Sequence, residues 1–275
     1  MKQFNGRVAA ITGAGSGIGR ALAVGLAGRG ADLSLSDIDQ QGLAETVGLC
    51  EGRGVKVTSN VLDVSDRAAV YAWADQVADE HGTVNLVINN AGVALGATVE
   101  GMSYEDFDWL MNINFWGVVY GTKAFLPHLK ASGEGHIVNI SSVFGLISVP
   151  SQSAYNAAKF AVRGFSDTLR MELEIERSCV SATTIHPGGI KTNIARRARI
   201  DPSVAGLGGG EESATQFDRL ARTTPTRAAE QILAAVCRDR RRATIGADGA
   251  VIDFISRLPA GLYQRALVLG ARRRR

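Results

Sequence analysis

The chain has 275 residues, 45% of them hydrophobic and 21% charged, which is typical of a soluble globular protein with a full core. Its formal net charge of +3 is too small to indicate a nucleic-acid partner, and no apolar run reaches the roughly 18 residues of a membrane-spanning helix. The three cysteines are widely spaced and the four histidines scattered, so we expect neither a disulfide framework nor a metal site. No signal peptide is predicted ahead of the first strand, and we expect a cytoplasmic protein.

Apolar runs that predict strands alternate with amphipathic segments that predict helices. This alternation predicts an α/β fold, one doubly wound domain over residues 1–250 with a mostly parallel, seven-stranded sheet and helices on both faces. Residues 188–223, with a glycine-rich run at 206–210, interrupt the alternation and are expected to form a lid. The predicted strands are residues 7–12, 32–36, 55–60, 84–89, 136–140, 180–185 and 243–245. The predicted helices are residues 20–29, 40–50, 66–81, 103–130, a helix around residue 155, and 224–238.

A glycine-rich segment, Gly13-Ala-Gly-Ser-Gly-Ile-Gly19, separates the first strand from the first helix. Strand, glycine-rich turn and helix form the layout that binds dinucleotides, with the pyrophosphate at the helix N-terminus. The spacing is GxxxGxG and not the GxGxxG fingerprint. The alternative is a tight turn that holds no ligand.

Asp37 ends the second strand and is expected to accept hydrogen bonds from an adenosine ribose 2′-OH while repelling a 2′-phosphate. No Arg or Lys stands at positions 15, 16, 37, 38 or 39 to pair with such a phosphate. We therefore predict NAD as the cofactor over NADP, with capping of the next helix as the alternative role of Asp37. Asp63, after the third strand, is expected near the adenine. Asn90, Ala91 and Gly92, after the fourth strand, are expected to pack against the cofactor or to form a simple turn.

Tyr155 and Lys159 lie four residues apart in a helical run and so share one face. An ammonium beside a phenol favours the phenolate, so Lys159 is expected to lower the pKa of Tyr155. Bringing that pKa from about 10 to about 7 or 8 takes roughly 3 to 4 kcal/mol. The pair is a candidate acid/base group.

Four motifs occur in one order: Thr12-Gly-Ala-Gly-Ser-Gly-Ile-Gly19, Asn89-Asn-Ala-Gly92, Tyr155-x-x-x-Lys159, and Pro187-Gly188 followed by Thr192. In this order the chain, over about residues 5 to 250, resembles the short-chain dehydrogenase/reductase family. The resemblance implies a Rossmann domain and an oxidoreductase that interconverts alcohols and ketones. It also implies a homodimer or homotetramer.

The resemblance further implies a catalytic tetrad of Asn114, Ser142, Tyr155 and Lys159. Tyr155 would be the acid/base, Lys159 would hold the nicotinamide ribose, Ser142 would bond the substrate oxygen, and Asn114 would hold a water in a proton relay. Ser141 and Asn112 are the close competitors of Ser142 and Asn114. The expected cofactor-binding residues are Gly13, Ser16, Gly17, Ile18, Gly19, Asp37, Asp63, Val64, Asn90, Ala91, Gly92, Tyr155, Lys159, Pro187, Gly188, Ile190 and Thr192.

The residues that follow the fifth strand and the Asn89–Gly92 motif are nearly all apolar. Apolar walls with one polar contact point suit a lipophilic secondary alcohol or ketone. The alternative is that half of these residues pack as core under the lid. The expected substrate-binding residues are Ser142, Phe144, Leu146, Val149 and Tyr155.

Residues 251–275 form an apolar extension with basic residues and end in Arg272 to Arg275. One interpretation is peripheral contact with an anionic membrane. The other is a helix that covers the substrate entrance or a neighbouring subunit.

Taken together, the sequence predicts an NAD-dependent oxidoreductase acting on a lipophilic secondary alcohol or ketone. The alternatives are an NADPH-dependent ketoreductase and a non-catalytic dinucleotide-binding regulator.

Overall fold

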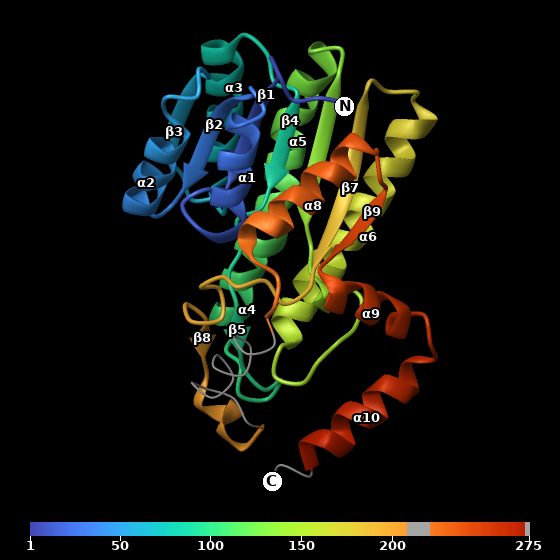
Figure 1. The fold of residues 1–275 in the computed structure, drawn as a ribbon. Coiled ribbons are helices and arrows are strands. Elements are labelled where there is room, and N and C mark those ends of the chain that lie inside the picture. The colour runs from blue at the N-terminus through green and yellow to red at the C-terminus, as the bar shows by residue number, and fades with distance from the viewer. Residues whose placement is uncertain (208–220, 273–275) are drawn as a thin grey trace.

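The computed structural model describes residues 1–207 and 221–272, and it contains a seven-stranded sheet in which every pairing is parallel. The strand order is β3-β2-β1-β4-β6-β7-β9, so the chain reverses its direction of travel across the sheet between β1 and β4 (Figure 1). The predicted α/β fold is confirmed. The strands are β1 (Val8–Thr12), β2 (Asp32–Asp37), β3 (Val57–Val61), β4 (Leu86–Asn89), β6 (Gly135–Ile140), β7 (Val180–Pro187) and β9 (Arg242–Ile245).

Helices cover both faces of the sheet and each face has its own hydrophobic core. On β1, the alternate side chains of Ala9 and Ile11 enter one core, while those of Val8 and Ala10 enter the other. Strands buried on two sides read as continuous apolar runs, which is why the sequence predicted them. The first core takes α1 (Gly17–Ala27), α2 (Gln40–Cys50) and α8 (Pro225–Cys237), and the second takes α3 (Arg67–His81), α5 (Gly117–Ala131) and α6 (Ser153–Ile175).

The predicted helix over residues 103–130 consists of three consecutive pieces. α4 (Tyr104–Met111) is capped by Ser103, and a π-helical turn, η1 (Asn112–Trp116), joins it to α5. Pro127 lies inside α5, near its end. Such π-helical turns interrupt the regular hydrogen-bond ladder and often mark functional sites.

Segments of two residues form a second, separate sheet that the sequence did not predict. β5 (Leu95–Gly96) pairs in parallel with β8 (Arg199–Ile200), which lies in the expected lid. A short 3₁₀ helix, η3 (Pro202–Leu207), follows β8. Most of the glycine-rich run at 206–210 lies outside the described residues. After β9 the chain forms α9 (Ala247–Ser256) and α10 (Ala260–Arg272).

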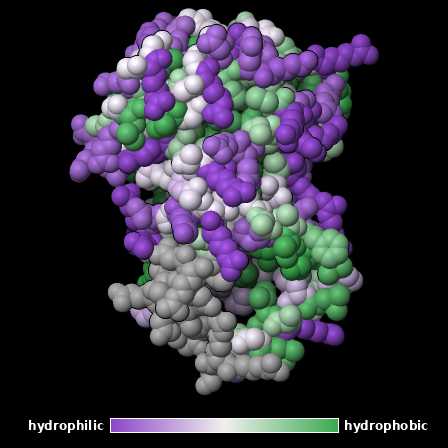
Figure 2. Space-filling model, in the orientation of Figure 1, coloured by the Kyte–Doolittle hydropathy of each residue, from purple (hydrophilic) through white to green (hydrophobic). Residues whose placement is uncertain are grey.

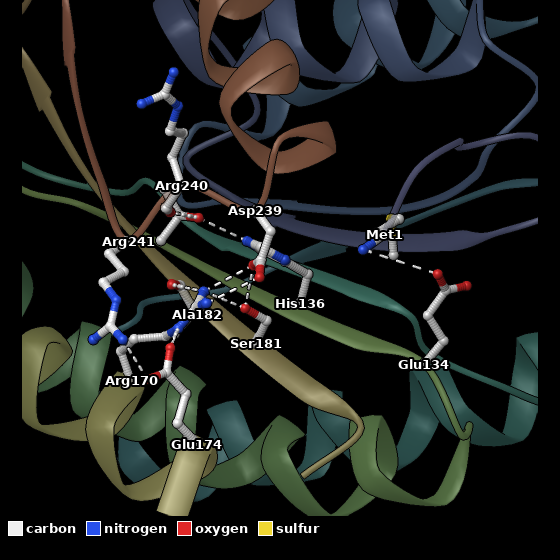
Figure 3. Close-up of polar contacts among 11 residues, drawn as sticks. Met1, Glu134, His136, Arg170, Glu174, Ser181, Ala182, Asp239, Arg240 and Arg241 are labelled. Atoms are coloured by element: carbon white, nitrogen blue, oxygen red, sulfur yellow. Dashed lines mark hydrogen bonds and ion pairs between the residues drawn. The ribbon is translucent and has the colours of Figure 1, made fainter. Parts of the chain in front are cut away.

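An ion-pair network fixes the second half of α6, the helix that carries Tyr155 and Lys159 (Figure 3). The Arg170 guanidinium donates to both carboxylate oxygens of Asp239, at 2.8 and 2.9 Å, and to Glu174 at 2.6 Å. The same guanidinium donates to the carbonyl of Ala182 at 3.2 Å. The network therefore fastens α6 to β7 and to the turn before β9, which sets the position of the candidate site at the other end of the helix.

Candidate active site

Asn90 fastens the glycine-rich turn to the end of β4. Its Nδ2 donates to the carbonyls of Thr12 and Gly13, both at 3.0 Å, and the Thr12 hydroxyl accepts the N–H groups of Asn90 and Ala91. A Cβ on Gly13 would lie 2.8 Å from the Ala91 Cα, and one on Gly19 would lie 2.1 Å from the Gly13 oxygen. The loops after β1 and β4 therefore form one continuous floor at the point where the strand order reverses, which is where open α/β sheets bind ligands.

The N-terminus of α1 has no side-chain cap. Ser16 is the N-cap residue, but its side chain accepts no hydrogen bond from the helix, and the first turn contains no acidic residue. Free N–H groups and the positive end of the helix dipole are what a pyrophosphate needs. The residues present therefore fit a dinucleotide at this end of α1. Side-chain caps do begin α2, α3, α4 and α8, from Asp39, Asp66, Ser103 and Thr224.

The Asp37 carboxylate bridges the glycine-rich turn and the loop after β2. Its Oδ2 accepts the N–H of Gly15 at 2.7 Å, and its Oδ1 accepts the N–H of Asp39 at 2.9 Å. The cap of α2 is Asp39, which accepts the N–H of Gly42. The alternative role of Asp37 as a helix cap is therefore wrong, and its carboxylate lies beside the turn expected to hold the cofactor.

Two arginines from elsewhere in the chain lie at the loop after β2 and at the glycine-rich turn. An Nη of Arg197, in the expected lid, lies 3.4 Å from the Asp39 carboxylate, and an Nη of Arg20 donates to the Gly15 carbonyl. The hydrogen bond from the Gly42 N–H and, to a smaller extent, Arg197 lower the pKa of Asp39. The positions next to Asp37 in the sequence contain no Arg or Lys, but the fold brings the positive charges of Arg20 and Arg197 to the glycine-rich turn and the loop after β2.

Asp63 and Val64 lie in the turn after β3, at the same edge of the sheet. Asp63 is exposed, and its Oδ1 accepts both the N–H and the hydroxyl of Ser65, at 2.9 and 2.7 Å. Val64 is buried against the start of α5, where a Cβ on Gly117 would lie 2.9 Å from its Cγ2. Their contact with an adenine stays a prediction.

Ser142 is placed between β6 and the short 3₁₀ helix η2 (Val143–Gly145) that follows it. Its hydroxyl accepts the N–H of Phe144 at 3.1 Å and forms a hydrogen bond with Tyr155. The competing hydroxyl, Ser141, donates instead to the Lys159 carbonyl at 2.8 Å and is fully engaged with α6. The structure thus places Ser142, and not Ser141, beside the phenol.

Lys159 does not lower the pKa of Tyr155 in the structure, which corrects the expectation from their spacing. Desolvation raises the pKa of the Tyr155 phenol above its ordinary value of 10, and the hydrogen bond with Ser142 acts in the opposite direction. The Lys159 Nζ lies 5.6 Å from the centre of the Tyr155 ring and donates to the Ile140 carbonyl at 3.1 Å. Burial lowers the pKa of Lys159 itself to about 8. Burial of both groups therefore outweighs the benefit of an ammonium near a phenol.

Asn114 is completely buried in the π-helical turn η1, whereas its competitor Asn112 is exposed. Its side-chain amide pairs with the Val93 peptide, accepting the N–H and donating to the carbonyl, both at 2.8 Å. A Cβ on Gly92 would lie 3.1 Å from the Asn114 Oδ1 and 3.6 Å from the Lys159 Nζ. Asn114 thus holds the loop after β4 against Lys159, and its role in a proton relay stays a prediction.

The loop after β7 lies over the glycine-rich turn. Gly17, with a φ of +54°, faces Thr192, whose Cγ2 would lie 3.2 Å from a Cβ at that position. Gly188 donates its N–H to the Ile245 carbonyl, and Ile190 is buried and bridges to Thr223. The loop after Pro187 therefore brings Thr192 to the start of α1, as expected of a cofactor contact.

The expected substrate residues differ in their accessibility. The Phe144 ring meets the Tyr155 ring edge to face, with centres 6.2 Å apart, and Val149 lines a cavity of about 540 Å³ between α6 and α10. Leu146 is buried with 6% of its surface exposed, so a direct contact with a substrate stays a prediction for it. Val143 and Ile147 are buried as well, which agrees with the alternative that part of this segment is core.

Two residues at the site were missed by the sequence reasoning. His186 is completely buried, and its Nδ1 lies 2.8 Å from the Ser142 carbonyl. The Asp248 carboxylate, in the first turn of α9, accepts the N–H of Gly189. Each side chain contacts a backbone group that is distant in the sequence, so no local sequence motif predicts either residue. The described residues contain no group of three or more His, Cys, Asp or Glu that could hold a metal ion.

Comparison with known proteins gives consistent matches. Residues 7–203 match the family model of the short chain dehydrogenases. SadH of Mycobacterium tuberculosis, named as an oxidoreductase, is 50% identical over 98% of this chain and 97% of its own. Human estradiol 17-beta-dehydrogenase 11 is 37% identical over 69% of this chain and 65% of its own. A Burkholderia phymatum short chain dehydrogenase/reductase, solved in complex with NAD, superposes with a TM-score of 0.80 at 34% identity and covers 89% of this chain and 90% of its own.

Proposed function

The chain belongs to the short-chain dehydrogenase family, and on this basis we propose that it interconverts a secondary alcohol and the corresponding ketone with NAD. The observation that carries the proposal is the grouping of Ser142, Tyr155 and Lys159 at the sheet edge that also carries the glycine-rich turn. A proton-transferring phenol beside a dinucleotide site is the arrangement that hydride transfer from an alcohol requires.

Tyr155 transfers the proton. In alcohol oxidation its phenolate accepts the hydroxyl proton of the substrate, and in ketone reduction its phenol returns that proton to the developing alkoxide. The raised pKa of Tyr155 keeps the phenol protonated at neutral pH, which favours the reducing direction there. Ser142, hydrogen-bonded to the same phenol, orients the substrate oxygen.

The cofactor, when bound, supplies the group that accepts or gives the hydride. The uncapped start of α1 would hold its pyrophosphate, and Lys159 and Thr192 would hold its nicotinamide end. Asp37 would accept a hydrogen bond from the ribose. The Asp37 carboxylate supports NAD as the cofactor because it repels a 2′-phosphate.

Arg197 favours a second candidate, an NADPH-dependent ketoreductase. Its guanidinium lies 3.4 Å from the Asp39 carboxylate, in the loop after β2, where a 2′-phosphate would be held if NADP bound. Arg197 already pairs with Asp39, and the nearby Asp37 carboxylate would repel a 2′-phosphate. NAD therefore stays the preferred cofactor in this proposal.

The surroundings of Tyr155 support a lipophilic substrate. Val93, Leu95 and Leu110 belong to the apolar cluster that packs around Tyr155, and Phe144 covers the ring edge. A pocket with apolar walls and one hydrogen-bonding pair selects the carbinol group and excludes strongly polar molecules.

A panel of lipophilic secondary alcohols and their ketones, assayed with NAD and NADP in both forms, tests the proposal. We expect NADH to form from at least one alcohol and the matching ketone to consume NADH. Binding of NAD by calorimetry without turnover of any member would support the non-catalytic alternative, and turnover with NADPH alone would support the ketoreductase.

A further inference from the structure

The last two helices expose apolar side chains that no described residue covers. α10 has no buried residue, and in Figure 2 hydrophobic surface gathers where α9 and α10 lie in Figure 1. We call this surface the C-terminal apolar face. Its side chains, with exposed fractions between 42% and 66%, are Val251, Phe254, Leu258, Leu262 and Leu269.

The charge of the same segment is of one sign. The chain has 30 basic and 27 acidic residues, and the segment after Asp253 contains six arginines and no acidic residue. The preceding 253 residues therefore hold 24 basic and 27 acidic side chains, a formal charge of −3. The excess positive charge of this protein thus belongs to the same segment of sequence as the C-terminal apolar face.

On α10 the leucines and arginines are arranged side by side. Leu262 and Leu269 are seven residues apart and share one side of the helix, and Arg265 and Arg272 follow each of them by three residues. Arg265 and Arg272 form no ion pair with residues 1–207 or 221–272, whereas Arg257 pairs with Asp253 at 2.8 Å. Long basic side chains beside apolar ones can extend to lipid phosphates while the apolar side chains enter the membrane interface.

The other side of α10 faces the body of the protein. The Tyr263 hydroxyl accepts the N–H of Ser148 at 3.3 Å, and Leu267 and Val268 line the 540 Å³ cavity together with Val149 and Phe160. The outward side is therefore the one left for a partner. The inward side lies beside the loop that leads back to Ser142.

We propose that the C-terminal apolar face docks this protein on the surface of an anionic lipid bilayer, with α10 lying in the plane of the interface. Anionic headgroups provide the negative charge that Arg265 and Arg272 lack among the described residues, and the acyl boundary takes up the leucines. α10 has 13 residues and is about 20 Å long, too short to span the roughly 30 Å of hydrocarbon. None of the described helices is long and apolar enough to cross a membrane.

A second copy of the chain is a poorer occupant of this face. A two-fold contact through it would bring together two copies of a segment that carries arginines and no acidic residue after Asp253. Like charges placed opposite one another at an interface are unfavourable.

Cosedimentation of the full chain with vesicles tests the proposal. We expect the protein to pellet with vesicles of phosphatidylcholine and phosphatidylglycerol, and not with vesicles of phosphatidylcholine alone. The double variants Leu262→Ser with Leu269→Ser, and Arg265→Glu with Arg272→Glu, should each bind anionic vesicles about 10-fold more weakly or worse.

Matched controls carry the same changes on exposed residues of other elements. These are Val61→Ser with Ile175→Ser and Arg67→Glu with Arg238→Glu, and both should bind vesicles like the unmodified protein. Equal thermal stability of all four variants shows that they fold.

The proposal is overturned if the unmodified protein does not bind anionic vesicles, or if the controls lose as much binding as the α10 variants. It is also overturned if sedimentation velocity shows a dimer that the leucine variant dissociates while vesicle binding is absent. Binding of lipid does not depend on turnover, so the result stands apart from the proposed function.

Discussion

The Asp248 carboxylate accepts the N–H of Gly189, and so ties the start of α9 to the loop that follows β7. The contact is tight, because a Cβ on Gly188 would lie 2.3 Å from the Asp248 Oδ2, and one on Gly246 would lie 2.6 Å from its Oδ1. The loop it holds carries Ile190 and Thr192, the expected contacts of the nicotinamide. A residue outside the family motifs thus positions one wall of the candidate cofactor site.

Replacement of Asp248 tests this positioning role. Asp248→Ala should raise the KM for NAD about 10-fold and leave kcat less affected, because a hydrogen bond to a charged group contributes about 1.5 to 3 kcal/mol. Asp248→Asn keeps an oxygen for the Gly189 N–H and should restore most of the affinity. If Asp248→Ala lowers the melting temperature while the KM for NAD is unchanged, the role is only structural.

Tyr155→Phe should lower kcat by at least about 10²- to 10⁴-fold, because it removes the proton-transferring hydroxyl and leaves the ring in place. NAD binding, measured by calorimetry, should persist. Ser142→Ala should lower kcat as well, whereas Ser141→Ala should affect stability more than turnover because the Ser141 hydroxyl bonds the Lys159 carbonyl. Unimpaired turnover of the phenylalanine variant would remove Tyr155 from its proposed role.

The pH dependence of ketone reduction should follow the titration of the Lys159 ammonium. Tyr155, with its pKa above 10, stays protonated up to alkaline pH, whereas Lys159, with a pKa of about 8, loses its charge there. We expect kcat/KM for the ketone to fall above about pH 8, and alcohol oxidation to rise with pH as phenolate forms. In Lys159→Arg the cation persists to higher pH. The inflection near pH 8 should therefore disappear from the reductive profile, and its persistence would assign it to another group.

Asp37→Asn and Asp37→Ala should both raise the ratio of kcat/KM for NADP to that for NAD by about 10-fold or more, since each removes a negative charge that opposes the 2′-phosphate. Asparagine keeps one oxygen, which can still accept the N–H of Gly15 or that of Asp39, whereas alanine accepts neither. Comparison of the two variants therefore separates the effect of charge from that of loop geometry. If the ratio of kcat/KM values is unchanged in both variants, Asp37 does not distinguish the ribose of NAD from that of NADP.

Two buried histidines make stability depend on pH. Burial lowers the pKa of His136 to about 3 and that of His186 to about 4. As pH falls, the unfolded chain protonates these histidines near pH 6.5, whereas the folded chain protonates them only near pH 4 and 3. Their contribution to the free energy of unfolding is therefore complete above about pH 6.5 and is lost progressively as pH falls toward 4 and 3. Thr183 donates its hydroxyl to the Arg240 carbonyl and so accepts the Nε2–H of His136, and no other described residue accepts a second proton from Nδ1.

His136→Asn should therefore be less stable than the unmodified protein at pH 7. It should, however, lose less free energy of unfolding between pH 7 and pH 5. Urea denaturation at the two pH values measures both effects, and equal losses in the two proteins would contradict the assignment to His136.

The sequence by itself determined the architecture. Continuous apolar runs such as the one at 7–12 are typical of strands in a sheet covered on both faces, and their alternation with helices favours parallel pairing. The glycine-rich turn, Asp37 and the 155–159 pair could be located because each of them depends on residue type and local spacing.

Tertiary structure decided whatever depends on long-range packing. The pairing of Leu95 with Arg199, the salt bridge of Arg197 with Asp39 and the tie of Asp248 to Gly189 each join segments far apart in the chain, and none has a local pattern. The pKa of Tyr155 is the clearest case. The spacing to Lys159 predicted a lower value, but desolvation, which depends on everything packed around the phenol, raises it.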